Sequence, residues 1–141
     1  MDNIWKKDMG IVQAKAFSKD CIVGHLGIKF LKRGDDFLKA SMPVDKRTIQ
    51  PLGILHGGAS VVLAETLGSA ASYMSLDESR YSVGLEVNAN HIKSVSSGIV
   101  TGIARPVHLG NSTQVWDITI KNEDDKLICL SRLTMAVLKV K

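Results

Sequence analysis

Residues 57–76 carry the strongest helix signal in the chain, and their apolar side chains are not confined to one face. Between Ala59 and Met74 the apolar residues recur all round the helix, which predicts a helix buried on nearly every side. One helix lying on one flat sheet would leave its outer face in water. The segment therefore requires a sheet curled round the helix, a second subunit, or both.

A single carboxylate interrupts this apolar helix. Carboxylates are almost never fully buried without a partner, and no Lys or Arg lies three or four residues from Glu65 to supply one. At 100° per residue, Ser69 lies about 40° to one side of Glu65 and Ser72 about 20° to the other. The three residues are predicted to form a narrow polar seam. A desolvated carboxylate in a ligand cleft is favoured over one that reaches solvent through a gap, because the surroundings are so apolar.

The helix begins in an unusual way. His56, Gly57 and Gly58 stand where Ser, Thr, Asp or Asn would be the usual cap. Two glycines allow a ligand to approach the backbone closely, and the unpaired N–H groups suit an oxyanion or a polarised carbonyl. Taken alone, the glycines indicate only a tight turn. Together with Glu65, two turns further on, they supply the parts that acyl-transfer chemistry requires.

Strand signals flank the helix on both sides. Residues 21–33 are predicted to form a strand that turns at residues 34–36 into a second strand over 37–43, and residues 1–20 a short helix. Four further strands are predicted at residues 81–92, 98–107, 113–121 and 127–140. Short connections imply antiparallel pairing, and one long helix must cover one face of the sheet. The predicted fold class is α+β.

Length and composition limit the number of domains, the kind of ligand and the cellular location that can be expected. A chain of 141 residues with 45% apolar residues predicts a single domain over residues 1–141. The net charge of +4 suits an anionic ligand as well as nucleic acid, but the basic residues are scattered, which disfavours nucleic acid. Cys21 and Cys129 are expected to be small buried residues without a disulfide. Without a signal-peptide pattern or a membrane-length apolar run, a soluble cytoplasmic protein is expected.

The sequence lacks the motifs of metal sites, serine hydrolases and nucleotide-binding proteins. Cys21 and His25 make one pair without the second pair that a structural zinc site needs, so no metal or cofactor is expected. The G-x-S-x-G elbow of serine hydrolases, the Walker A sequence and the G-x-G-x-x-G fingerprint do not occur.

Several motifs together resemble the hotdog-fold acyl-CoA thioesterases of the PaaI-like branch. The resemblance covers roughly residues 20–138 and is closest to enzymes that hydrolyse 1,4-dihydroxy-2-naphthoyl-CoA in menaquinone synthesis. The motifs are residues 50–51 (QP), 55–65 (LHGGASVVLAE), 68–69 (GS), 83–91 (VGLEVNANH), 106–110 (PVHLG) and 131–134 (SRLT).

The resemblance implies an antiparallel sheet wrapped round one long central helix. It also implies a homodimer whose two sheets join, with acyl-CoA bound at the interface, and dimers that often pair into tetramers. Glu65 would then be the catalytic nucleophile or general base. The Gly57 N–H would polarise the thioester carbonyl, Gln50 and His56 would orient the reacting groups, and Ser69 would bind the aryl substituent or the water.

The resemblance also implies where CoA binds. Lys93 stands where close relatives often carry Arg, and it would meet a phosphate without the bidentate fork. The candidate CoA-binding residues are Gly84, His91, Lys93, Ser94, His108, Gly110 and Ser112. Three alternatives remain open at this point: a proofreading thioesterase that acts on an aryl carrier protein, a hotdog dehydratase, and a non-catalytic acyl-CoA binding module.

Overall fold

A computed structural model describes residues 2–141. Two short helices, α1 (Ile11–Phe17) and α2 (Ile22–His25), precede the sheet, and the long helix α3 (Gly57–Ser75) follows its first two strands. The strands are β1 (Lys29–Arg33), β2 (Leu38–Pro43), β3 (Arg80–His91), β4 (Ile99–Leu109), β5 (Thr113–Lys121) and β6 (Leu127–Lys139). The predicted long helix and the four strands after it are confirmed, each bound lying within two residues of its predicted position.

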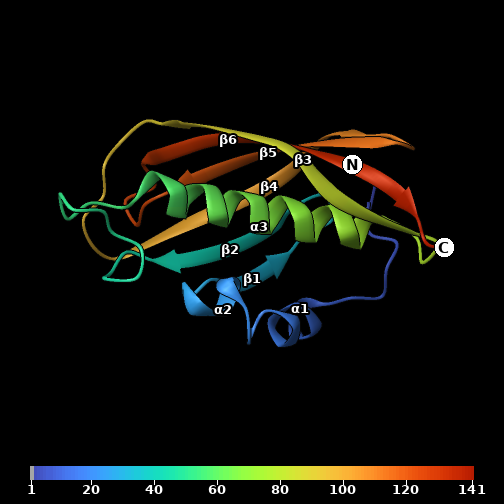
Figure 1. Ribbon diagram of the computed structural model, residues 1–141, viewed down its shortest axis with the longest axis horizontal. Helices are drawn as coiled ribbons and strands as arrows, with labels where there is room; N and C mark the ends of the chain where they lie inside the picture. Colours follow the sequence, from blue (N-terminus) through green and yellow to red (C-terminus); the bar gives the residue numbers. More distant parts are fainter. Residues whose placement is uncertain (1) are drawn as a thin grey trace.

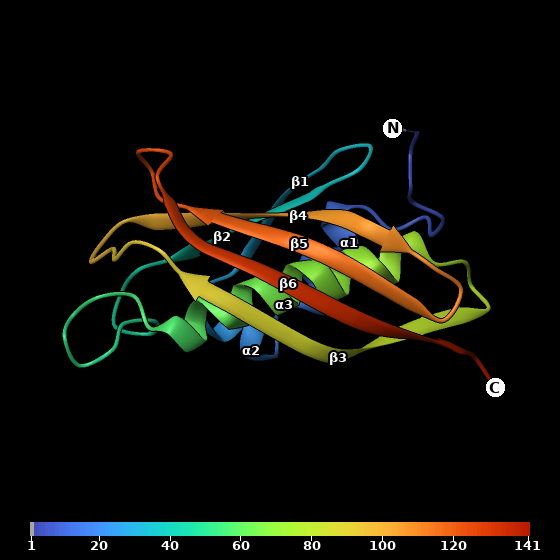
Figure 2. The same ribbon diagram turned by 90° about the horizontal axis from the view of Figure 1, so that it is seen from above.

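All six strands form one antiparallel sheet in the order β1-β2-β4-β5-β6-β3. β3 does not pair with β4, which follows it in the chain, but crosses to pair with β6 along the far edge (Figure 2). The free edge of β3 is rich in exposed apolar side chains, among them Tyr81, Val83 and Leu85. The predicted α+β class, with an antiparallel sheet curved round a long helix, is confirmed.

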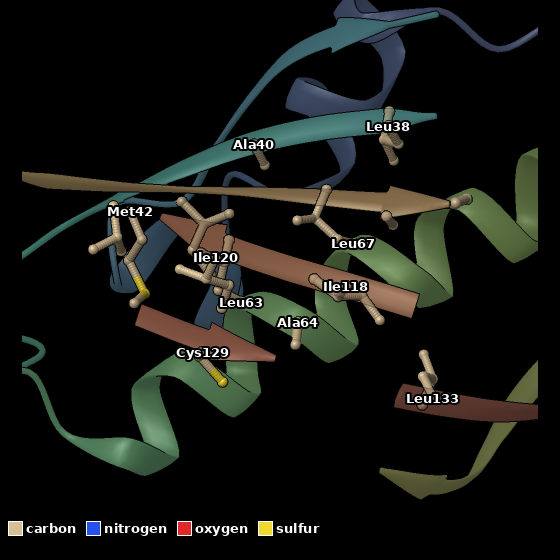
Figure 3. Packing of buried hydrophobic residues seen from close by; sticks show 14 of the residues in the cluster. Leu38, Ala40, Met42, Leu63, Ala64, Leu67, Ile118, Ile120, Cys129 and Leu133 are labelled. Carbon is tan, nitrogen blue, oxygen red and sulfur yellow. The ribbon is translucent and has the colours of Figure 1, made fainter. Parts of the chain in front are cut away.

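The core lies between α3 and the concave face of the sheet (Figure 1). Leu63 and Leu67 of α3 have no exposed surface, and they point toward Ile118 and Ile120 of β5 and toward β2 (Figure 3). The helix packs close to β6 at Gly68, where an added Cβ would stand 2.5 Å from Leu133 Cδ2. A residue without a side chain is needed at this crossing.

The opposite face of α3 is less covered. Val62, Glu65, Thr66, Ser69 and Ala70 are half-buried, and the N-terminal segment with α1 and α2 lies on this side of the helix (Figure 1). In one chain, α3 is therefore not enclosed on every side.

The predicted strand over 21–33 is wrong in its first half. Residues 22–25 form the helical turn α2, and the strand begins only at Lys29. The Gly24 N–H donates to the Ser18 carbonyl at 2.9 Å, and Gly27 turns the chain with a φ of 71°. These local contacts override the β propensity of the apolar run. The expectation for Cys21 is also wrong, since it is exposed at this turn, whereas Cys129 is buried; both are free.

The N-terminal segment is tied to the far end of α3. Lys7 is only 6% exposed, and its Nζ donates to the Asp77 carbonyl at 2.7 Å, just beyond the last turn of the helix. The Lys7 backbone N–H donates to the Met74 carbonyl at 3.1 Å. The Trp5 ring stacks on Trp116 with centroids 6.5 Å apart. The hydrogen bond to Met74 supplies a partner to a carbonyl in the last turn of the helix, where the intrahelical donors run out. Across residues 2–141, no helix is long and apolar enough to cross a membrane.

Candidate active site

His56 caps the N-terminus of α3. Its Nδ1 accepts a hydrogen bond from the Gly58 N–H at 2.8 Å, so imidazole takes the place of the usual hydroxyl or carboxylate cap. A ring nitrogen that accepts carries no proton, and the neutral ring therefore carries its proton on Nε2. The cap thus presents a second N–H donor beside the helix N-terminus.

The loop before His56 is held by its own hydrogen bonds. The Thr48 carbonyl accepts from the His56 N–H at 2.8 Å, and hydrogen bonds from Arg47 lower the pKa of Asp45 to about 2. The Gln50 side-chain carbonyl accepts from the Leu52 N–H at 2.5 Å. This contact fixes the amide group and leaves its NH₂ end to face a ligand.

The first N–H of the helix is available for binding. The N–H at the first helical position has no acceptor within the helix, and His56 already occupies the next N–H, that of Gly58. The His91 imidazole covers the Gly57 Cα, because an added Cβ there would stand 2.9 Å from His91 Nε2. The predicted residues Gly57, His56 and His91 are thus brought together at the positive end of the helix dipole.

A pocket of about 500 Å³ contains Glu65. Its α3 wall holds the carboxylate together with two hydroxyl side chains, Thr66 and Ser69, and the rest of its lining is largely apolar. None of its lining residues in the described chain carries a positive charge. The lining residues are Phe17, Ser18, Cys21, Ile22, Val23, Phe30, Val62, Glu65, Thr66, Ser69 and Ala70.

The carboxylate also touches the sheet. An added Cβ at Gly84 would stand 2.8 Å from Glu65 Oε1, so β3 comes closest to the carboxylate where it has no side chain. Ser69 shares this pocket and lies 3.8 Å from Met135 Sδ. Ser72 does not belong to the predicted polar seam, because it is fully buried against β3 and bonds to Ser82 Oγ at 2.8 Å.

Gly57 and Glu65 lie far apart in one chain. Eight residues along an α-helix span about 12 Å. A thioester carbonyl is much shorter than that separation, so one chain cannot offer it both the Gly57 N–H and the Glu65 carboxylate. The two halves of the predicted chemistry are present but separate in a single subunit.

The predicted CoA-binding residues also fall into separate groups. His91, Lys93 and Ser94 lie where β3 ends, beside the N-terminus of α3, whereas His108, Gly110 and Ser112 lie where β4 turns into β5. Gly84 is level with the second group, because Met135 of β6 pairs with both Gly84 and Gln114, and it lies seven residues before His91, or about 23 Å along the strand. One chain cannot direct both groups at the same phosphate.

The sequence reasoning missed the N-terminal wall of the pocket. Phe17, Ile22 and Val23 line the pocket that contains Glu65, and no pattern in the sequence of this segment indicates that they do. Among residues 2–141, no group of three or more His, Cys, Asp or Glu side chains is placed to hold a metal ion.

A long helix held in a curved antiparallel sheet is the hotdog fold. Residues 52–129 match the model of the thioesterase superfamily. The chain belongs to this superfamily and is an acyl-CoA thioesterase. These matches confirm the resemblance found in the sequence.

Two named relatives match nearly the whole chain. A 1,4-dihydroxy-2-naphthoyl-CoA hydrolase from Escherichia coli is 50% identical over 96% of this chain and 99% of its own length. A proofreading thioesterase, EntH, from Cronobacter turicensis is 48% identical over 96% of this chain and 98% of its own.

The fold matches a solved thioesterase from Haemophilus influenzae with a TM-score of 0.95 and 48% identity, over 96% of this chain and 95% of that one. Two structures of one Staphylococcus aureus protein, one of which is described as a thioesterase, match with TM-scores of 0.82 and 0.80. They are 40% and 41% identical to this chain, over 85% and 84% of it, and cover 100% and 98% of their own chains. In one a glutamate, and in the other a glutamine, is replaced by alanine.

Proposed function

We propose that this protein hydrolyses an aromatic acyl-CoA thioester, 1,4-dihydroxy-2-naphthoyl-CoA or a related aryl-CoA, to the free acid and CoA. The observation that carries this proposal is the Glu65 carboxylate in an apolar pocket large enough for an aromatic acyl group. The E. coli relative is named for hydrolysis of 1,4-dihydroxy-2-naphthoyl-CoA, which supports the same substrate class here.

The chemistry begins at the thioester carbonyl. The Gly57 N–H, at the positive end of the helix dipole, donates to the carbonyl oxygen and stabilises the negative charge that develops on it. Such a donor is typically worth about 2.7–4 kcal/mol of barrier. Gln50, through its amide NH₂, and His56, through its Nε2–H, lie at the same helix end and orient the reacting groups.

Glu65 then acts in one of two ways. As a nucleophile it attacks the carbonyl carbon and expels the CoA thiolate, and water hydrolyses the resulting anhydride. As a general base it removes a proton from the water that attacks this carbon. Both routes consume one water and yield the acid and CoA. Ser69, one turn beyond Glu65, binds the water or a hydroxyl substituent of the ring.

The active site takes residues from two copies of the chain. Gly57 and Glu65 lie about 12 Å apart along one helix, so a partner subunit supplies one of them to each thioester. The free β3 edge, with its exposed Tyr81, Val83 and Leu85, is the surface through which two sheets join in a homodimer. Such a dimer also joins the two groups of CoA-binding residues, and dimers pair further into a tetramer.

The Staphylococcus aureus structures support the choice of residues. The glutamine and the glutamate replaced in them are separated by the same number of positions as Gln50 and Glu65 here. The spacing, together with 40% and 41% identity, favours these two residues as the counterparts.

A carrier-protein thioester is the second candidate substrate, because EntH, a proofreading thioesterase, is 48% identical to this chain. A panel of thioesters tests the proposal: aryl and alkyl groups on CoA, and the aryl groups on a holo aryl carrier protein, with free thiol as the readout. We expect kcat/KM to be highest for a bicyclic or monocyclic aryl-CoA.

Three other results would redirect the proposal. Faster release from the carrier protein than from CoA would favour proofreading. Hydration of an enoyl-CoA with the thioester retained would indicate a dehydratase. Binding across the panel without any thiol release would indicate a non-catalytic module.

A further inference from the structure

The pocket that holds Glu65 has two walls of different origin. One wall is α3, the other is the segment from Phe17 to Val23, which joins α1 to α2, and Phe30 of β1 completes the lining. The part of the chain that matches the superfamily, residues 52–129, contains the α3 wall and leaves the N-terminal wall outside. Glu65 therefore lies within the region that matches the superfamily, while the opposite wall lies before it in the chain.

This N-terminal wall has a defined shape. The Ser18 carbonyl accepts from the Gly24 N–H at 2.9 Å, and Ser18 Oγ donates to the Ala14 carbonyl at 2.7 Å. The chain turns back on itself so tightly that an added Cβ at Gly24 would stand 2.5 Å from the Lys19 carbonyl oxygen. Val23 packs against the core and anchors the wall. A closed turn anchored in this way keeps its side chains in place for a ligand.

Two large apolar side chains of this wall face water. Phe17 is 79% exposed and Ile22 is 56% exposed, and both line the pocket that contains Glu65. Apolar surface of this kind at the rim of a cavity is typical of a ligand-binding groove. An apolar group bound between the walls would cover both side chains.

The charge of the pocket further restricts which acyl group can bind in it. Glu65 is its one acidic residue, and no cation lines it in the described chain. A bound group with its own carboxylate would be repelled by Glu65. The pocket thus fits a neutral, mainly apolar group, with Ser69 and Thr66 available to bind a hydroxyl on it.

We propose that Phe17, Ile22 and Val23 form the wall that selects the acyl group, by contacting the ring of a bulky, uncharged acyl thioester on the side opposite Glu65. This inference rests on the proposed thioesterase function and assigns its acyl specificity to a segment outside the superfamily match. Phe17 and Ile22 cover the ring at the rim, and Val23 sets the depth of the pocket.

The test compares acyl groups of increasing size on the same CoA carrier. Naphthoyl-CoA, benzoyl-CoA and acetyl-CoA are assayed by thiol release with the wild type, Phe17→Ala, Ile22→Ala and Val23→Phe. Val12→Ala is the matched control, because Val12 lies on α1, is 78% exposed and does not line the pocket. The readout is the ratio of kcat/KM for naphthoyl-CoA to that for acetyl-CoA.

We expect this ratio to fall by about tenfold in Phe17→Ala and in Ile22→Ala, and not in Val12→Ala, because hydrophobic pocket contacts discriminate by factors of this size. Val23→Phe shortens the pocket, so it should reduce naphthoyl-CoA turnover more than benzoyl-CoA turnover. Phe17→Ala and Ile22→Ala alter exposed side chains, and they keep the test valid if Val23→Phe does not fold.

Two results would overturn the inference: an unchanged ratio in both alanine variants, or an equal loss on all three thioesters. Both are distinct from failure of the proposed function, in which the wild type releases no thiol from any aryl-CoA. If the wild type is active and the alanine variants keep its kcat/KM ratio, only the role of the N-terminal wall is rejected.

Discussion

The Glu65 carboxylate of α3 lies directly against Gly84 of β3, where an added Cβ would stand 2.8 Å from Glu65 Oε1. The edge strand β3 and the central helix therefore define the position of this carboxylate together. Gly84 is also where the pairing of β3 with β6 shifts register, so the strand is irregular at the point of contact. A side chain at this position would require the carboxylate or the strand to move.

Replacement of Gly84 by alanine should displace the carboxylate without unfolding the protein. A misplacement of about 1 Å at a reacting group can reduce the rate by about 100-fold, and a loss of this order in kcat is expected. Asp124→Ala is the control, since Asp124 is exposed in the turn between β5 and β6, away from α3 and from the β3 edge. Wild-type kcat in Gly84→Ala would show that the contact has no functional role.

His56 is expected to have two separable roles. His56→Ala removes the cap of α3 and should lower the free energy of unfolding by about 1 kcal/mol. His56→Asn retains a side-chain acceptor and should largely preserve stability. Both variants lack the Nε2–H donor, so both should lose thioester hydrolysis. Full activity in His56→Asn, measured beside its denaturation curve, would reduce His56 to a helix cap.

The separation of Gly57 and Glu65 predicts that inactive variants complement each other. In a hybrid of one Glu65→Ala chain and one His56→Ala chain, one site carries both substitutions and the other carries neither. Two differently tagged chains are coexpressed and purified through both tags. Dimers that contain one chain of each kind should regain about half of the wild-type activity per dimer, whereas two homodimers joined in one tetramer contribute none.

The matched control for this experiment is a hybrid of Glu65→Ala with Glu65→Gln, in which no site is intact. It should remain as inactive as its parents. If the first hybrid is equally inactive, Glu65 and His56 act from the same chain, and the two-subunit site is wrong.

Lys7 is predicted to stabilise the fold through α3 rather than through catalysis. Its Nζ donates to the Asp77 carbonyl, and its ion pair with Glu78 is weak because Glu78 is 82% exposed. The Asp77 carbonyl also accepts from the Arg80 N–H at 3.2 Å, so Lys7→Met removes one of its two hydrogen bonds. The variant should lower the free energy of unfolding by about 0.5–1.5 kcal/mol. The neighbouring exposed Lys6→Met is the control in urea denaturation at one fixed protein concentration. Equal midpoints for the two variants would contradict this role.

The sequence predicted those elements whose pattern is local. The alternation of Trp116, Ile118 and Ile120 with polar residues gave β5 its correct bounds, because a strand that is buried on one face repeats every second residue. The position of β3 beside β6 was not predicted, since strand order depends on contacts between distant parts of the chain. The apolar run at Ile22 and Val23 was misread as a strand because its helical turn depends on a contact with Ser18.

Site residues with a local sequence pattern could likewise be predicted, and those that depend on contacts between distant segments could not. Glu65 could be found because one carboxylate in an apolar helix stands out in any sequence. Ser72 could not be separated from Glu65 by helical angle alone, because only the packed sheet shows that it faces Ser82. Phe17 joins the pocket through the fold of the N-terminal segment, which no sequence period encodes.

The central claim, that Glu65 performs thioester hydrolysis, is tested most directly by single-turnover release of CoA from naphthoyl-CoA in the wild type and in Glu65→Gln. The amide keeps the shape of the side chain but can neither attack the carbonyl nor accept a proton. The single-turnover rate is expected to fall by at least about 10²–10⁴-fold, with the circular dichroism spectrum and the oligomeric state unchanged. Release of CoA by Glu65→Gln at a rate close to that of the wild type would contradict the account.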